Sequence, residues 1–252
     1  MHEKPLIKVL TDAGLGSRRK MADAIRDGRV EVSGVIAESF NHPVDTDIDR
    51  VFFDGQRVKI KPEETICLAL HKTSGVVSTL KDEKNRPTVL DILPEKFQKL
   101  HLYPVGRLDI DTTGLILLTN DGNLTNRLTH PRYEIEKEYY VQIDGSLKPD
   151  EIYTLKHGVL LEDGITAPAK VRKINSLPYN YSVIIHEGRK RQVRRMFEHL
   201  GHPVKSLQRV RIGTVSLGNL APGAVRLLTP LEIKSLYLSS DSKTNFSNRS
   251  SL

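Results

Sequence analysis

The residues best suited to chemistry lie in a polar stretch, residues 105–114, that reads Val-Gly-Arg-Leu-Asp-Ile-Asp-Thr-Thr-Gly. It contains two carboxylates, Asp109 and Asp111, and runs into the apolar residues 115–118. A carboxylate held at the mouth of a rigid buried strand can act as a nucleophile or a general base. Aspartates in such a loop also cap backbone amides in ordinary turns, so the stretch alone leaves both interpretations open.

Basic residues are concentrated further along the chain. The 38 Lys/Arg residues outnumber the 31 Asp/Glu residues, giving a formal net charge of +7. Between His186 and Arg211 the chain has Arg189, Lys190, Arg191, Arg194, Arg195, Lys205, Arg209 and Arg211 against only Glu187 and Glu198. Such a focused excess suits the phosphates of a nucleic acid better than a diffuse one, although a solvated basic helix remains the alternative.

The elements that must position these groups are strands and helices in irregular order. We expect strands at residues 66–71, 115–119, 138–144 and 181–186, and helices at 124–128, 149–156 and 192–200. In the last helix Val193, Met196, Phe197 and Leu200 share one face. Because there is no regular βαβ alternation, the pattern favours an α+β fold with a mixed sheet.

The chain divides by composition into three parts. Residues 1–61 read as a small domain, with residues 61–64 as the linker, residues 62–238 as a larger domain, and the Ser- and Asn-rich residues 239–252 as a disordered tail. Cys67 is the only cysteine and lies in an apolar run, so we expect a buried strand residue and no intrachain disulfide. No apolar run approaches the ~20 residues of a membrane span, and there is no signal peptide. We therefore expect a soluble, cytoplasmic monomer.

The first part has two helical stretches and a hairpin. An apolar face begins at residues 7–10, Ser17 can cap a helix over 18–27, and Gly28 ends it. Asp54-Gly55 indicates a hairpin between residues 51–53 and 58–60. Residues 8–34, with the run Gly-Ser-Arg-Arg-Lys at 16–20 and Gly-Arg-Val at 28–30, resemble the S4 RNA-binding domain. The resemblance implies phosphate contacts from Arg18, Arg19, Lys20 and Arg29; a solvated helix face is the alternative.

The second part resembles the bacterial ribosomal pseudouridine synthases that carry an N-terminal S4 domain. The resemblance rests on Gly-Arg-Leu-Asp at 106–109 with the following Thr-x-Gly-Leu, and on Leu-Leu-Thr-Asn-Asp-Gly at 117–122. It implies that Asp109 is the nucleophile and that Arg107 fills the space left by a flipped base. Asp111 lies at a position that the family does not fix, and receives no catalytic role.

Three further segments follow in the family's order. Residues 72–78 resemble a strand and turn beneath the active site, with Thr73 where proline is common. Residues 127–139 resemble the motif whose tyrosine packs against the target base, here Tyr139, with Tyr140 on the opposite side of its strand. Residues 187–196 resemble the motif whose arginine, here Arg194, pairs with the catalytic aspartate.

The resemblance implies isomerisation of uridine in ribosomal RNA, free or in an assembling ribosomal particle, without a cofactor or metal. Arg189, Lys190, Arg191 and Arg195 are the expected RNA contacts. Arg191, where small-subunit enzymes often have histidine, favours large-subunit RNA. Whether Asp109 attacks the base or the ribose stays open.

Three alternatives accompany this interpretation. The first is a small-subunit RNA target, and the second is a non-catalytic S4 ribosome-binding protein. The third is a magnesium-dependent haloacid-dehalogenase-like phosphatase, because residues 109–113 also satisfy Asp-x-Asp-x-Thr. In those phosphatases an unbroken apolar strand runs into the first aspartate, whereas Pro104, Gly106 and Arg107 interrupt it here.

Overall fold

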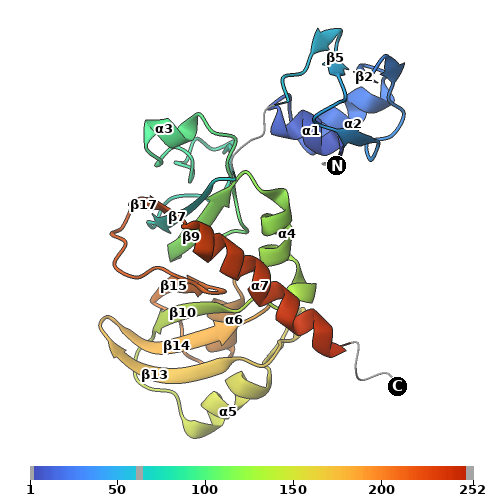
Figure 1. Cartoon of the computed structure of the whole chain (residues 1–252). Coiled ribbons are helices and arrows are strands. Elements are labelled where there is room, and N and C mark those ends of the chain that lie inside the picture. Colours follow the sequence, from blue (N-terminus) through green and yellow to red (C-terminus); the bar gives the residue numbers. More distant parts are fainter. Residues whose placement is uncertain (1–2, 61–64, 248–252) are drawn as a thin grey trace. The chain divides into compact units, whose positions relative to one another are not determined.

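The computed structural model describes residues 3–60 and 65–247, which form two compact units, Met1–Thr65 and Ile66–Leu252 (Figure 1). The sequence placed the boundary after residue 61, and the linker expected at residues 61–64 lies outside the described residues.

The helices of the first unit follow the local signals of the sequence. Helix α1 spans Leu6–Asp12 and helix α2 spans Arg18–Arg26. The Ser17 hydroxyl accepts a hydrogen bond from the Lys20 amide at 3.2 Å, which confirms the predicted N-cap. Apolar side chains of both helices, among them Leu10, Met21 and Ile25, form the core of this unit.

Short antiparallel strands complete the first unit. A four-stranded sheet has the order β3 (Val35–Ile36), β2 (Val30–Val32), β5 (Val51–Phe53) and β6 (Gln56–Arg57), and β1 (Glu3–Pro5) pairs with β4 (Pro43–Asp45). The predicted hairpin at Asp54-Gly55 is present, but its second strand begins at Gln56 rather than at residue 58. Both turn residues have positive φ, and a two-residue turn of that kind places the partner strand directly after it.

A nine-stranded mixed sheet forms the centre of the second unit. Its main path is β13 (Lys170–Ser176), β14 (Tyr179–Ile185), β10 (Lys137–Gln142), β15 (Ser206–Ile212), β9 (Thr113–Thr119), β7 (Cys67–Lys72) and β17 (Val225–Leu227). Strand β8 (Tyr103–Pro104) pairs with β9, and β16 (Val215–Ser216) pairs with β15. Only β15 and β9 run parallel along this path, so the mixed α+β character predicted from the sequence is confirmed.

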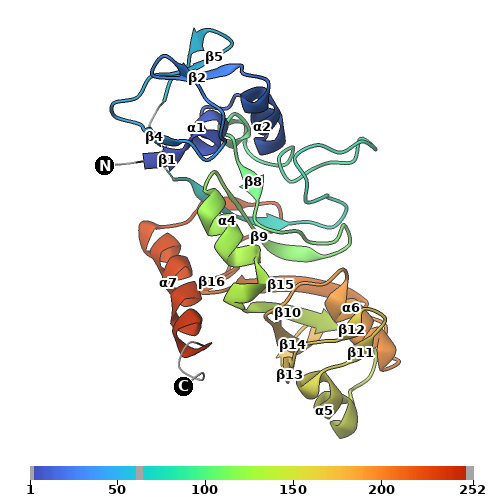
Figure 2. The ribbon, with the colours of Figure 1, turned by 90° about the vertical axis from the view of Figure 1, so that its right-hand side faces the viewer.

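Both faces of the central strands are buried, each by its own core. Alternate residues of β7 enter different clusters: Leu68 and Leu70 face one side, Cys67 and Ala69 the other. Helices α4 (Gly122–Thr129) and α7 (Pro230–Ser247) cover the Cys67 side, as Figures 1 and 2 show. Helices α5 (Pro149–His157) and α6 (Gln192–His199) cover the other. The three helices and four strands expected in this part are all present, and each begins and ends within two residues of its expected bounds.

Small elements connect these layers. They are helix α3 (Glu95–Gln98), a 3-10 turn at Pro131–Tyr133, and the hairpin of β11 (Leu160–Leu161) and β12 (Gly164–Ile165).

The predicted disorder of the tail is wrong for residues 239–247, because α7 continues to Ser247. Its first turns are anchored by Leu236, which is fully buried, and extending an anchored helix adds one backbone hydrogen bond per residue fixed. Residues 248–252 lie outside the described residues. Among the described helices, none combines the length and the hydrophobicity that a membrane crossing requires.

Candidate active site

Asp109 lies in the loop that joins the antiparallel strands β8 and β9. The Thr112 amide donates a hydrogen bond to the Asp109 carbonyl at 3.1 Å, closing a turn around the carboxylate. The Asp109 side chain is 33% exposed and borders a pocket of about 820 Å³. The turn that the sequence left open as a structural alternative therefore exists, and it presents the carboxylate to a cavity.

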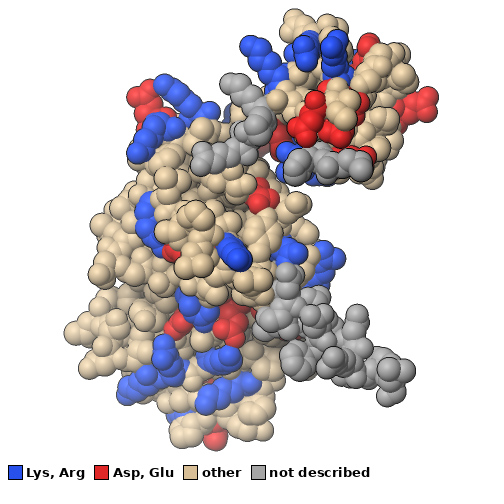
Figure 3. Space-filling model, in the orientation of Figure 1, with Lys and Arg blue, Asp and Glu red and all other residues tan. Residues whose placement is uncertain are grey.

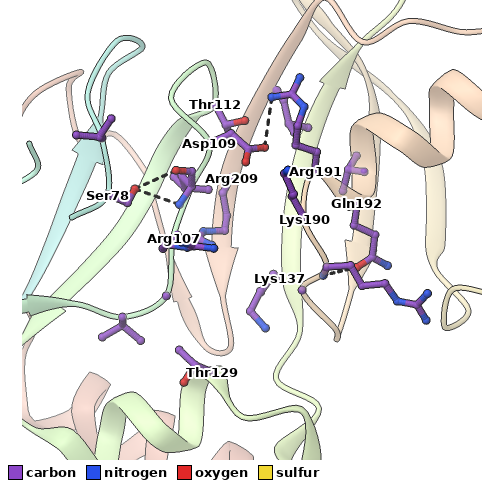
Figure 4. A pocket seen from close by; sticks show the side chains of 18 of the residues that line it. Ser78, Arg107, Asp109, Thr112, Thr129, Lys137, Lys190, Arg191, Gln192 and Arg209 are labelled. Atoms are coloured by element: carbon purple, nitrogen blue, oxygen red, sulfur yellow. Dashed lines mark hydrogen bonds and ion pairs between the residues drawn. The ribbon is translucent and has the colours of Figure 1, made fainter. Parts of the chain in front are cut away.

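Hydrogen bonds fix the backbone on both sides of Asp109. The buried Ser78 hydroxyl donates to the Leu108 carbonyl and accepts from the Leu108 amide, both at 3.1 Å (Figure 4). The Gly75 amide donates to the Ile110 carbonyl at 2.9 Å. The segment expected beneath the active site thus holds the loop in place through its own polar groups.

Lys72 ends strand β7 and is completely buried below the same loop. Its ammonium donates to the carbonyls of Thr73, Val76 and Ile110 at 3.0, 2.8 and 3.3 Å. Burial lowers the pKa of Lys72 to about 8, while the charges of Asp111 and Asp109 act in the opposite direction. Lys72 lies in the segment 72–78 that the sequence placed beneath the active site, but no role was expected for it; a lysine at the end of a largely apolar strand was the available signal.

The arginine partners of Asp109 differ from the expectation. Arg191 Nη1 lies 3.9 Å from Asp109 Oδ2, whereas the ion pair of Arg194 is to Asp111, with Nη2 3.3 Å from Oδ2. Arg194 also donates to the carbonyls of Val204 and Asp111, at 3.1 and 3.2 Å. Among the described residues, the buried guanidinium of Arg194 therefore pairs with Asp111 and not with Asp109, contrary to the expectation.

Asp111 links the two arginines. Arg191 donates to both of its carboxylate oxygens, at 3.1 and 3.3 Å. Partial burial raises the pKa of Asp111, but the hydrogen bond from Arg191 and the charge of Arg194 outweigh it, and the net direction is downward. Burial also lowers the pKa of Arg194, against the effect of Asp111. Asp111, for which no catalytic role was expected, thus binds both Arg191 and Arg194.

Tyr139 faces the pocket from strand β10. Its side chain is only 9% exposed and lines the same cavity as Asp109. Tyr140 is half-buried outside the pocket lining, with its ring 6.0 Å from that of Tyr179. The predicted division between the two tyrosines is confirmed, and an aromatic face lies in the pocket of the carboxylate.

Gly114 allows strand β9, which follows the Asp109 loop, to lie close to strand β15. A Cβ at this position would lie 2.2 Å from the Arg209 carbonyl oxygen, so only glycine permits the parallel pairing of β9 with β15. The side chain of Arg209 lines the pocket, as does that of Lys137 on β10. No role was expected for Lys137, and Arg209 was expected only as one of the basic residues between His186 and Arg211.

The basic residues expected to bind RNA have different environments. Arg107 and Lys190 are exposed and line the pocket, and Arg191 lines it as well (Figure 4). Arg189 lines it too, but donates to the carbonyls of the β11–β12 turn. Arg195 is outside the lining, because both of its terminal nitrogens bind the Asp163 carboxylate of that turn, at 3.0 and 2.9 Å. The expectation that Arg195 is available for RNA is therefore not supported.

In the first unit, Arg18, Arg19 and Lys20 occupy the exposed first turn of α2. Arg29 instead forms a two-pronged ion pair with Asp54 and lies over the Phe53 ring, 5.0 Å from its centre. Figure 3 shows basic side chains spread over several parts of the face drawn, with acidic ones between them. In the second unit Cys67 is buried as predicted, and burial raises its pKa to about 12.

Comparison with known proteins agrees with this arrangement. The family described as RNA pseudouridylate synthase matches residues 66–199. Ribosomal large subunit pseudouridine synthase B of Bacillus subtilis is 41% identical over 244 residues, covering 95% of this chain and 98% of that protein. The Yersinia pestis protein of the same name is 42% identical over 225 residues, covering 86% and 69%.

A solved structure supports the same grouping. The crystal structure of a pseudouridylate synthase is 34% identical, has a TM-score of 0.65, and covers 92% of this chain and 98% of that one. The phosphatase and non-catalytic alternatives are thereby set aside. A carboxylate loop, an aromatic wall and a cation-rich pocket on a mixed sheet, together with these similarities, show that the chain belongs to the RNA pseudouridylate synthase family.

Proposed function

We propose that this enzyme converts a uridine of large-subunit ribosomal RNA to pseudouridine, with Asp109 as the nucleophile. The observation that carries the proposal is a carboxylate on a loop whose backbone is hydrogen-bonded on both sides of Asp109, at the edge of a pocket that Tyr139 also lines. The relatives named above supply the substrate class, because two of them are named as acting on the large ribosomal subunit.

Arg191 and Arg194 would hold the nucleophile in position. A guanidinium forms directional ion pairs and hydrogen bonds with carboxylates. In the free protein Arg191 reaches Asp109 at 3.9 Å while hydrogen-bonded to Asp111. Arg194 supports Asp111 from the buried side. We infer that Asp111 positions both arginines and that Arg194 acts on Asp109 through this network.

The target base must leave the helical stack to reach Asp109, at a cost of a few kcal/mol. Tyr139 would stack on the extruded uracil, a contact worth roughly 1–3 kcal/mol. Arg107 is exposed at the pocket, two residues before Asp109, and would occupy the space that the base leaves.

The rest of the RNA would be held by basic side chains of both units. We propose that the first unit is an S4-type domain, supported by its helix pair, its small sheet and the exposed cations of α2. Lys190 and Arg191 at the pocket, together with Arg18, Arg19 and Lys20, would bind phosphates of ribosomal RNA or of an assembling particle. We further propose that the protein acts as a cytoplasmic monomer.

The test is pseudouridine mapping by carbodiimide labelling and primer extension, with EDTA present. Unmodified large- and small-subunit RNA are each incubated with wild-type protein, Asp109→Asn or Asp111→Asn. We expect one new stop on large-subunit RNA with the wild type, none with Asp109→Asn, and a slowed reaction with Asp111→Asn.

Each other outcome is informative. A stop on small-subunit RNA alone would mean that the substrate of the enzyme is small-subunit RNA. Activity that survives Asp109→Asn but not Asp111→Asn would contradict the nucleophile assignment.

A further inference from the structure

Two cations of the pocket have no carboxylate partner among the described residues. Arg209 is 3% exposed; its Nε donates to the Leu115 carbonyl at 2.8 Å, but its buried Nη2 has no hydrogen-bond partner. Lys137 donates only to the Ile135 carbonyl, at 3.2 Å. The acidic neighbours of Lys137 are engaged elsewhere: Glu136 pairs with Lys170 and Arg211, and Glu138 with Arg172 and Arg211.

This arrangement is unfavourable in the free protein. Burial and, to a lesser extent, the charge of Arg209 together lower the pKa of Lys137 to about 8. Buried guanidinium hydrogens are normally paired, and like charges placed together out of water oppose each other. A ligand with anionic or strongly accepting oxygens would relieve both costs.

The two cations belong to the pocket of the nucleophile. Arg209 lies on the central strand β15, in register with Tyr139 on one side and Gly114 on the other. Figure 4 shows the labelled Arg209 and Lys137 side chains projecting into the space that Asp109 borders. A base admitted between Asp109 and Tyr139 would present its polar edge to this part of the pocket.

We propose that Lys137 Nζ binds a carbonyl oxygen of the flipped uracil and that the buried charge of Arg209 beside it helps to stabilise the negative charge that the base carries after detachment. This rests on the proposed uridine isomerisation. When the N1–C1′ bond breaks, both electrons stay with the base, and the charge spreads over N1, O2 and O4. The base returns a pair through C5 to form the C5–C1′ bond; C5 loses its proton and N1 gains one.

Stabilising the uracil anion raises the rate of isomerisation more than the affinity for RNA. The base is anionic only between detachment and reattachment, so donors aimed at its oxygens act on the transition state rather than on bound uridine. Losing one donor of this kind costs about 10²–10³ in rate in comparable sites. A backbone phosphate is the other anion that the pair could hold, and its loss would weaken binding instead.

The experiment uses the full chain and a large-subunit RNA transcript. Single-turnover rates and RNA Kd are measured for wild type, Lys137→Met and Lys137→Arg, with Lys170→Met as a control, because Lys170 is an exposed lysine outside the pocket. We expect Lys137→Met to slow the reaction at least ~100-fold with Kd changed less than about threefold. Lys137→Arg should recover most of the rate, and Lys170→Met should match the wild type.

The pH profile separates this role from a structural one. The charged and titratable residues that line the pocket together with Lys137 include Arg209 on β15, His186 and Glu187 after β14, and Arg107 and Asp109 in the nucleophile loop. Only protonated Lys137 stabilises the anion, and its pKa is about 8, so the wild-type rate should fall above that pH. The fall should disappear in Lys137→Arg, because guanidinium stays protonated.

Arg209→Gln, which keeps a donor for Leu115, gives a second measurement, with urea unfolding to check the fold. Equal rates for wild type and Lys137→Met would overturn the proposal. So would a loss of RNA affinity matching the loss of rate, since that identifies a phosphate site. An inactive wild type would instead contradict the proposed function.

Discussion

Asp109 shares its nearest cation with a second carboxylate one turn of the loop away. Arg191 bonds Asp111 and lies 3.9 Å from Asp109, and Arg194 reaches only Asp111 among these two carboxylates. Asp111, which received no catalytic role from the sequence, thus binds both Arg191 and Arg194. At the scale of single residues, the site is a network rather than one aspartate–arginine pair.

Ser78 offers a test of how far the loop backbone matters. Ser78→Ala removes both bonds to Leu108 and leaves that buried amide unpaired, which should lower the free energy of unfolding by about 1–3 kcal/mol. The Asp109 loop should loosen, so the single-turnover rate should fall while RNA affinity stays constant. Urea unfolding and carbodiimide mapping measure the two effects. Ser74→Ala, at an exposed position of the same turn, is the control and should change neither.

At the scale of elements, the parallel pairing of β9 with β15 brings the nucleophile loop to the cationic strand. Strand β15 also pairs with β10, which carries Tyr139 and Lys137. One central strand therefore joins the residues from two distant segments of sequence. Gly114 makes the first of these pairings sterically possible.

Gly114→Ala should disrupt the parallel pairing of β9 with β15. The new Cβ would lie 2.2 Å from one backbone atom of Arg209 and 2.7 Å from another, at a φ of +101°. We expect the free energy of unfolding to fall by more than about 3 kcal/mol. Gly75→Ala has a φ of +86° but open space around the added atom, so it should cost only about 1–2 kcal/mol. Similar losses in urea unfolding for both variants would show that backbone strain, not the close approach, explains Gly114.

At the scale of the whole molecule, the basic excess has several functions. Arg189 and Arg195 hold the β11–β12 turn, Arg211 pairs with Glu136 and Glu138, and Arg29 pairs with Asp54. The total of 38 Lys and Arg residues consequently overstates the number of cations ready to contact RNA.

The salt dependence of RNA binding distinguishes the available cations from the paired ones. Each phosphate contact adds roughly 0.7–0.9 to the slope of log affinity against log salt concentration. The triple variant Arg18→Ala, Arg19→Ala, Lys20→Ala should therefore reduce the slope by about 2–3 in filter-binding titrations. Arg29→Ala should change it by less than ~0.5, because Asp54 already neutralises that guanidinium. A change of about 0.7–0.9 for Arg29→Ala would instead mean that RNA displaces Asp54.

The sequence by itself determined what depends on local pattern. Periodicity located four strands and three helices of the second unit, Ser17 marked a helix start, and alternation along β10 separated Tyr139 from Tyr140. The Gly-Arg-Leu-Asp motif identified the loop that borders the pocket. These features are retained in the folded protein because they depend on residues that are close together in the sequence.

Only the tertiary structure decided which charges meet. Residues far apart in sequence, such as Asp111 and Arg194 or Lys137 and Arg209, come together through strand order, and no spacing rule encodes that order. The β11–β12 turn removed Arg195 from the RNA-binding set by placing Asp163 beside it. The role of a charged side chain follows from which partner lies within reach, and that is fixed by packing of the whole sheet.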